Sequence, residues 1–197
     1  MKLCENGRDI CIGLFYTEIG AKTNNVDGWT MILLGLGGNL DSPEFGTPAQ
    51  NLDAALALLA ASGVRVAARS PFYRSAPVPP SDQPWFVNGV AHIETPLAPH
   101  ALLALLHRIE ARIGRIRGER WAARIIDLDL LAYGDRVITG QGENGLILPH
   151  PRLSERAFVL APLLDLAPSW RHPISGKDTR EMLGALGSGQ ELHRIDD

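Results

Sequence analysis

Two aspartates in the middle of the chain have the residue type and spacing for metal chemistry. Asp127 and Asp129 lie two residues apart within an apolar run, residues 125–133. Because side chains alternate along a strand, both carboxylates would lie on one face, with their Cα atoms about 6.6 Å apart. Mg²⁺ typically takes one or two carboxylates plus substrate phosphates. The spacing therefore predicts a site for one or two hard cations.

A cluster of arginines precedes these aspartates, at Arg115, Arg117, Arg120 and Arg124. A guanidinium matches phosphate oxygens with two parallel hydrogen bonds. Arginines beside a metal-binding carboxylate pair indicate phosphoryl transfer, which depends mostly on positioning and charge neutralisation. The alternative is that both groups are solvated surface charge, the usual fate of such residues. The spacing alone leaves both interpretations open.

The segment 119–129 resembles the signature of the 6-hydroxymethyl-7,8-dihydropterin pyrophosphokinase family, which carries Arg-Trp-Gly-Pro-Arg followed by Asp-Leu-Asp. Here Ala122 and Ala123 replace the usual Gly-Pro. The resemblance covers residues 31–185 and includes five further motifs in order: Leu36-Gly37-Gly38-Asn39-Leu40, Phe72-Tyr73-Arg74-Ser75, Gln83-Pro84-Trp85-Phe86-Val87-Asn88, Pro149-His150-Pro151-Arg152 and Arg156-Ala157-Phe158-Val159-Leu160. Ordered motifs are far more specific together than any one of them.

This resemblance implies an ATP-dependent pyrophosphokinase of tetrahydrofolate biosynthesis. Such an enzyme moves pyrophosphate from ATP to 6-hydroxymethyl-7,8-dihydropterin, giving the pterin diphosphate and AMP. The resemblance also implies two Mg²⁺ ions on Asp127 and Asp129, with Arg115 and Arg124 in catalytic roles. The implied ATP-binding residues are Glu110, Arg120, Trp121, His150 and Arg156, and the implied pterin-binding residues are Asn39, Ser75, Ala76, Val78, Phe86, Asn88, Trp121 and Phe158.

Two other functions remain open from the residues. One is another Mg²⁺-dependent phosphate-transfer enzyme with the same aspartate pair, which gives no account of the aromatic residues and Asn88. The other is a non-catalytic ferredoxin-like module that binds a ligand. An RNA-binding version usually needs a basic face and exposed aromatic residues, whereas the formal net charge is −3. We therefore expect small-molecule partners and no nucleic acid.

Composition is that of an ordinary globular protein, with 45% hydrophobic and 21% charged residues in 197. Both cysteines, Cys4 and Cys11, match no metal-binding spacing, which favours a cytoplasmic protein without structural disulfides. No apolar stretch reaches the roughly 20 residues that span a bilayer. We expect a monomer with two parts, an N-terminal extension (1–29) that is poorly ordered or peripheral and a pyrophosphokinase domain (30–197).

The elements that must position these residues follow from periodicity, caps and breakers. We expect strands at 31–36, 64–73, 86–94 and 125–133, helices at 48–61, 99–113, 154–166 and 179–186, a short hairpin near Val137 and Leu146, and a last edge strand at 191–195. Ser154 is the expected cap of the third helix. The order predicts an α+β fold with a ferredoxin-like βαββαβ core. Helices would cover one face of the antiparallel sheet, and long loops would close over the substrates.

Deleting residues 1–29 tests the predicted division of the chain. Motif matches, core periodicity and charge clustering all begin after Trp29. The truncated protein should therefore keep nearly the full activity and thermal stability of the whole chain. A large fall in its melting temperature would show that the extension packs on the domain.

Overall fold

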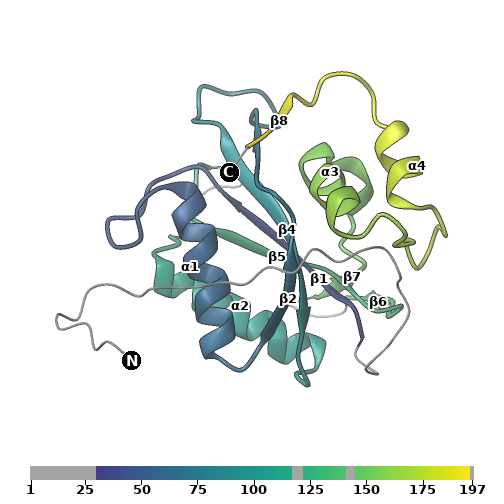
Figure 1. Cartoon of the computed structure of the whole chain (residues 1–197), viewed down its shortest axis with the longest axis horizontal. Helices are drawn as coiled ribbons and strands as arrows, with labels where there is room; N and C mark the ends of the chain where they lie inside the picture. The colour runs from purple at the N-terminus through teal and green to yellow at the C-terminus, as the bar shows by residue number, and fades with distance from the viewer. Residues whose placement is uncertain (1–29, 117–121, 141–144, 196–197) are drawn as a thin grey trace, which may run out of the picture.

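The computed structural model describes residues 30–116, 122–140 and 145–195. Within these ranges the largest sheet follows the order β5-β1-β4-β3-β8, with β2 also paired to β4. Its strands are β1 (Ile32–Gly38), β2 (Arg65–Arg69), β3 (Tyr73–Ser75), β4 (Phe86–Glu94), β5 (Asp127–Tyr133) and β8 (Leu192–Arg194). All the pairings between them are antiparallel. A mixed fold of helices on an antiparallel sheet is thus confirmed (Figure 1).

Local sequence sets the start of one long helix and the end of the other. In α1 (Pro48–Ala61), the Thr47 side chain accepts from the Gln50 amide and the Gln50 side chain accepts from the Thr47 amide. This capping box and the proline in the first turn begin the helix where predicted. In α2 (Pro99–Ile113), Gly114 ends the helix with a φ of 109°, a left-handed conformation that costs glycine little. Both helices are confirmed.

Helices cover both faces of the sheet, so the expectation that they share one face is wrong. Ile32, Leu34 and Leu36 of β1 pack with α1 and α2, whereas Leu33 packs with α3 (Ala157–Leu166) and α4 (Thr179–Gly184). Figure 1 shows α1 and α2 on one side of the sheet and α3 and α4 on the other. The reason lies in β1, because its successive apolar side chains alternate between two buried faces.

Several predicted elements differ in their bounds. The second strand divides into β2 and β3, since Pro71 donates no ladder hydrogen bond. Ser154 lies inside a 3₁₀ turn, η1 (Leu153–Glu155), and α3 begins only after Arg156, so Ser154 is not its cap. The expected hairpin forms as β6 (Ile138–Thr139) and β7 (Ile147–Leu148), and β8 is the expected edge strand.

Gly38 marks the end of β1, where the chain passes very close to the start of β5. A Cβ at this position would lie 2.4 Å from the Ile125 carbonyl oxygen. The next two amides, of Asn39 and Leu40, donate to the Arg124 carbonyl at 2.9 and 3.2 Å. The close approach therefore fixes the position of Arg124 relative to β1.

Gly38→Ala should destabilise the protein by about 1–3 kcal/mol, because the new methyl group meets backbone that cannot rotate away. Urea unfolding measures the change. Gly184→Ala is the matched control, since a Cβ there meets nothing within 4 Å and alanine favours the helix by up to about 1 kcal/mol. Equal stability of the two variants would contradict the close approach at Gly38.

Candidate active site

A cavity of about 200 Å³ opens at one end of the sheet, on the face covered by α3. Strands β1, β4 and β5, the loop after β3, and the start of α3 all contribute to its wall. Among the described residues its lining consists of Gly35, Leu36, Gly37, Ser75, Ala76, Pro77, Val78, Pro79, Ser81, Gln83, Phe86, Asn88, Gly89, Arg124, Asp127, Asp129, Leu131, Arg156, Phe158 and Val159. Most of the predicted pterin residues and both aspartates therefore meet in one cavity.

Gly37 separates two walls of the cavity. The acidic wall carries Asp127 and Asp129, and the amide wall carries Asn88. Gly37 of β1 pairs with Asp127 of β5 on one side and with Asn88 of β4 on the other. A Cβ at Gly37 would lie 3.1 Å from the Asn88 Oδ1 atom. Gly35, two residues earlier, lines the same cavity. Two glycines spaced two apart in a buried strand were a usable signal in the sequence, but neither Gly35 nor Gly37 was predicted as a site residue.

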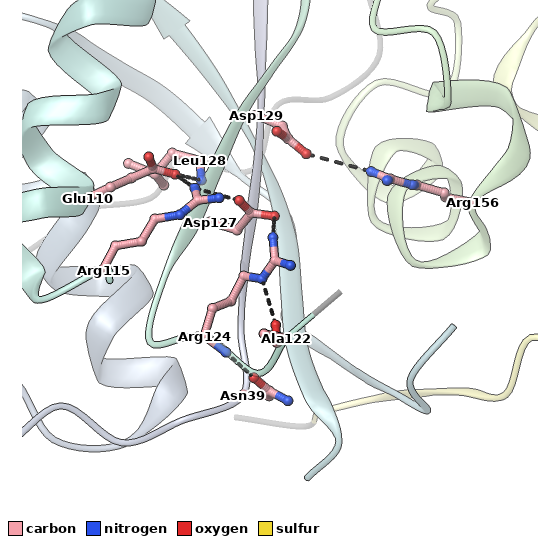
Figure 2. Close-up of polar contacts among 9 residues, drawn as sticks. All are labelled: Asn39, Glu110, Arg115, Ala122, Arg124, Asp127, Leu128, Asp129 and Arg156. Carbon is pink, nitrogen blue, oxygen red and sulfur yellow. Dashed lines mark hydrogen bonds and ion pairs between the residues drawn. The ribbon is translucent and has the colours of Figure 1, made fainter. Parts of the chain in front are cut away.

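Asp127 lies between two arginines from different ends of the Arg-rich connection (Figure 2). Its two carboxylate oxygens lie 2.6 Å from Arg115 Nη1 and 2.9 Å from Arg124 Nη1. Arg124 is held further by its Nε, which donates to the Ala122 carbonyl at 3.2 Å. The two arginines predicted to be catalytic thus converge on a predicted metal ligand.

Glu110 lies beneath this cluster, on α2. It is 2% exposed, and its carboxylate accepts from the Leu128 amide at 2.8 Å and pairs with Arg115. Burial raises the pKa of Glu110, although these two partners oppose the rise. The position suits a residue that fixes β5 and Arg115. Its predicted contact with ATP stays a prediction, since Glu110 is absent from the described lining of the cavity.

Asp129 faces Arg156 across the cavity, with 3.6 Å between Oδ2 and Nη1 (Figure 2). Burial, followed by the neighbouring Asp127 carboxylate, raises the pKa of Asp129 to about 6. These two effects outweigh the opposing attraction of Arg156. The raised pKa of Asp129 therefore reflects the cost of placing a charged carboxylate in a buried site beside Asp127.

Asn39 holds two loops together beside the cavity. Its Oδ1 accepts from the Arg124 amide at 2.8 Å, and its Nδ2 donates to the Pro84 carbonyl at 3.0 Å. Asn39 is 3% exposed and is not among the described lining residues. The structure thus gives it a positioning role, and its predicted contact with the pterin stays a prediction.

The opposite wall carries the groups suited to a flat heterocycle. Asn88 donates from Nδ2 to the Ser75 hydroxyl at 2.9 Å, which fixes the orientation of the amide. Phe86 and Phe158 line the cavity from β4 and α3. Aromatic faces and one oriented amide are the usual means of holding a polar ring.

His150 lies near the acidic cluster without lining the cavity among the described residues. Its Nδ1 accepts from the Arg152 amide at 3.1 Å. Burial, then the nearby Arg156, lowers the pKa of His150 to about 4, so it is neutral at physiological pH. Arg120 and Trp121, predicted for ATP and the pterin, lie outside the described residues, as does Arg117.

The donor set at Asp127 and Asp129 fits Mg²⁺. Two carboxylates on one strand face line the cavity, and burial together with the neighbouring Asp127 carboxylate raises the pKa of Asp129, a cost that a bound cation would offset. No group of three or more His, Cys, Asp or Glu side chains suited to a metal occurs in the described ranges. Mg²⁺ on phosphates usually takes its remaining ligands from substrate and water.

A carboxylate pair, three arginines and an aromatic pocket suit phosphoryl transfer. Residues 33–168 match the model of the family described as 7,8-dihydro-6-hydroxymethylpterin-pyrophosphokinase. The chain belongs to this family and is a pyrophosphokinase. Its relatives include proteins named 2-amino-4-hydroxy-6-hydroxymethyldihydropteridine pyrophosphokinase. The one from Methylorubrum extorquens is 44% identical over 158 residues (80% of this chain, 94% of that protein). The one from Pseudomonas aeruginosa is 43% identical over 155 residues (78% and 90%).

Solved structures show a similar fold. A Plasmodium falciparum HPPK-DHPS triple mutant, crystallised with pteroate, superposes with a TM-score of 0.62 at 15% identity. The match covers 79% of this chain and 43% of that chain, so this protein spans less than half of the Plasmodium one. At this identity the likeness concerns the fold alone.

No helix in the described part of the chain is long and apolar enough to cross a membrane.

Asp129→Asn should stabilise the metal-free protein at pH 7.5. The pKa of Asp129 is about 6 in the folded chain against 3.8 ordinarily, so protonation favours folding. That contribution is complete below pH 3.8 and is lost as the pH rises through about 6. An asparagine keeps the neutral shape at every pH.

Thermal unfolding in a chelating buffer measures this effect. The variant should exceed the wild type in melting temperature at pH 7.5, and the difference should shrink as the pH falls towards 4. Asp135→Asn, in the exposed turn after the same strand, is the matched control and should show no such pH-dependent gain. A lower melting temperature for Asp129→Asn at pH 7.5 would contradict the raised pKa of Asp129.

Proposed function

We propose that the cavity carries out pyrophosphate transfer from ATP to 6-hydroxymethyl-7,8-dihydropterin, with the nucleotide phosphates at Asp127 and Asp129 and the pterin at Asn88. The observation that supports this most is the row Asp127–Gly37–Asn88 across three paired strands. Two strand spacings separate the outer residues by about 10 Å. A hydroxymethyl group on a ring held at Asn88 would then point over Gly37 towards the phosphates.

Asp127 and Asp129 would hold two Mg²⁺ ions, which neutralise the triphosphate and polarise its oxygens when bound. Arg115 and Arg124, now paired with Asp127, would turn to the phosphates as the carboxylates take the cations. Arg156 would make the same exchange from Asp129. Guanidinium groups fixed beside the phosphates stabilise the charge that develops on the bridging oxygen as AMP leaves.

The pterin would lie between Phe86 and Phe158, with its polar edge on Asn88 and on Ser75 and Ala76 of the adjacent loop. Asn88 can both donate and accept, which suits a ring edge with alternating donors and acceptors. Val78, 40% exposed at the mouth of the cavity, would cover the ring. Closure of the loop after β3, which carries Val78, would exclude water from the phosphorus atom under attack.

The proposal also covers the fold, the division of the chain and the setting in which the protein works. The order β5-β1-β4, with β2 and β3 beyond β4, supports a ferredoxin-like core. Residues 30–197 would form the catalytic domain, with 1–29 as an extension. A monomer in the cytoplasm is the simplest setting for two small-molecule substrates. The family match favours neither of the two alternatives raised by the sequence. These were another Mg²⁺-dependent phosphate-transfer enzyme and a non-catalytic ligand-binding module.

The reaction is tested by following AMP release with ATP and Mg²⁺, with and without the pterin. AMP should appear only when the pterin is present. Asp127→Asn and Asp129→Asn should each lower turnover by on the order of 10²- to 10³-fold, because each removes a charged contact made to the reacting phosphates. Asp135→Asn should behave as wild type.

Circular dichroism should show all three variants folded. AMP release without the pterin would indicate hydrolysis instead, and full turnover in either active-site variant would remove that aspartate from the proposed metal site.

A further inference from the structure

Gln190 forms two hydrogen bonds that bracket Arg156. Its Oε1 accepts from the Ala157 amide at 2.8 Å, and its Nε2 donates to the Glu155 carbonyl at 2.9 Å. One side-chain amide thus fixes the backbone on both sides of a residue that points into the active site. Gln190 lies beyond residue 168, where the family match ends.

The first bond gives a partner to the amide of Ala157, the first residue of α3. Amides of the first helical turn have no partner within the helix. Arg156 occupies the N-cap position of α3, and its own side chain makes no capping bond within the described structure. Asn, Asp, Ser and Thr are the usual caps because their side chains accept from the first turn. Here the Ala157 amide finds its acceptor 33 residues further along the chain, in the side chain of Gln190.

This arrangement leaves the Arg156 guanidinium for the cavity. Its Nη1 lies 3.6 Å from Asp129 Oδ2, and its Cζ lies 5.5 Å from the centre of the Phe158 ring. A short side chain at this position could cap the helix but could not reach Asp129. Gln190 therefore supports the first turn of α3 from outside, while the N-cap residue faces the active site.

The residues that follow Gln190, up to residue 195, contact other elements that line the same cavity. β8 pairs with β3, whose last residue is Ser75, and the Glu191 carbonyl accepts from the Ala76 amide at 3.2 Å. The His193 ring stacks on Trp85 with centres 5.5 Å apart. Figure 1 shows the chain running from α4 past α3 to β8 at the edge of the sheet. One short segment thus contacts both the start of α3 and the loop that follows β3.

We propose that Gln190 is a positioning residue that holds Arg156 towards Asp129 and the ATP phosphates, from a segment outside the matched family region. The inference rests on the role proposed above for Arg156. Gln190 acts on substrate only through the backbone of residues 155–157. Its loss should weaken binding of the nucleotide more than it slows the chemical step.

Gln190→Ala is the first test, with Gln50→Ala as its matched control. Gln50 Oε1 also accepts a capping-box bond, from the Thr47 amide at 2.8 Å, at the start of α1. Gln190→Ala should raise KM for Mg²⁺-ATP about three- to tenfold, the range of one lost hydrogen bond, with kcat within about twofold of wild type. Gln50→Ala should lower the melting temperature by a similar few degrees and leave both constants unchanged.

The second test places Gln190→Ala in an Arg156→Ala background. Because Gln190 acts through Arg156, the double variant should show no higher KM for Mg²⁺-ATP than Arg156→Ala alone. An equal further rise in KM would show that Gln190 acts by another route and would overturn the inference. So would an unchanged KM in Gln190→Ala beside a raised KM in Arg156→Ala.

Failure of the underlying function gives different results. An unchanged KM in Arg156→Ala would overturn the assignment of Arg156 to ATP, and this inference with it, while wild-type AMP release would still report on the reaction. Melting temperatures of all four variants, measured beside the kinetics, separate a general loss of folded protein from the specific change in KM.

Discussion

The pairing of half-buried carboxylates with arginines is the constraint on which the rest of this structure depends. Asp127 and Asp129 lie on one face of β5, and three arginines reach them from three places: beyond the end of α2, the entry to β5, and the start of α3. At Asp127, which two arginines contact, removing one partner is costly, because the other charges then stay in a poorly solvated site. The chain therefore brings α2, β5 and α3 together at one end of the sheet.

The sheet supplies the second requirement, which is separation of two kinds of ligand. β1 lies between β5 and β4, and it presents Gly35 and Gly37 to the cavity. Larger side chains there would meet Leu131 at 3.3 Å and Asn88 at 3.1 Å from the first carbon alone. The glycines therefore leave a channel from the amide wall to the acidic wall. A substrate that must be joined to a phosphate needs such a path, and a purely structural strand would be better packed without it.

Sequence patterns predicted most elements because their signals are local. Thr47 with Gln50 begins α1, Gly114 ends α2, and alternation along β5 puts both aspartates on one face. Features that depend on contacts between distant segments were missed. The face covered by α3 was predicted wrongly, since helical periodicity does not say which side of a sheet a later helix will cover. The same limit applies to Gln190, whose capping bonds reach across the fold and leave no local pattern.

Charge balance indicates how the ligands must arrive. In the ion-paired cluster, the formal charges of Arg115, Arg124 and Arg156 balance those of Glu110, Asp127 and Asp129. A triphosphate brings about four negative charges, which would lie unpaired beside the aspartates if it bound alone. Cations alone would compete with arginines that already occupy the carboxylates. In the proposed reaction, ATP and two Mg²⁺ ions together would keep the cluster near neutral while the arginines move from carboxylate to phosphate. The site should therefore bind nucleotide and metal as one unit, since either alone leaves charge uncompensated in a half-buried cavity.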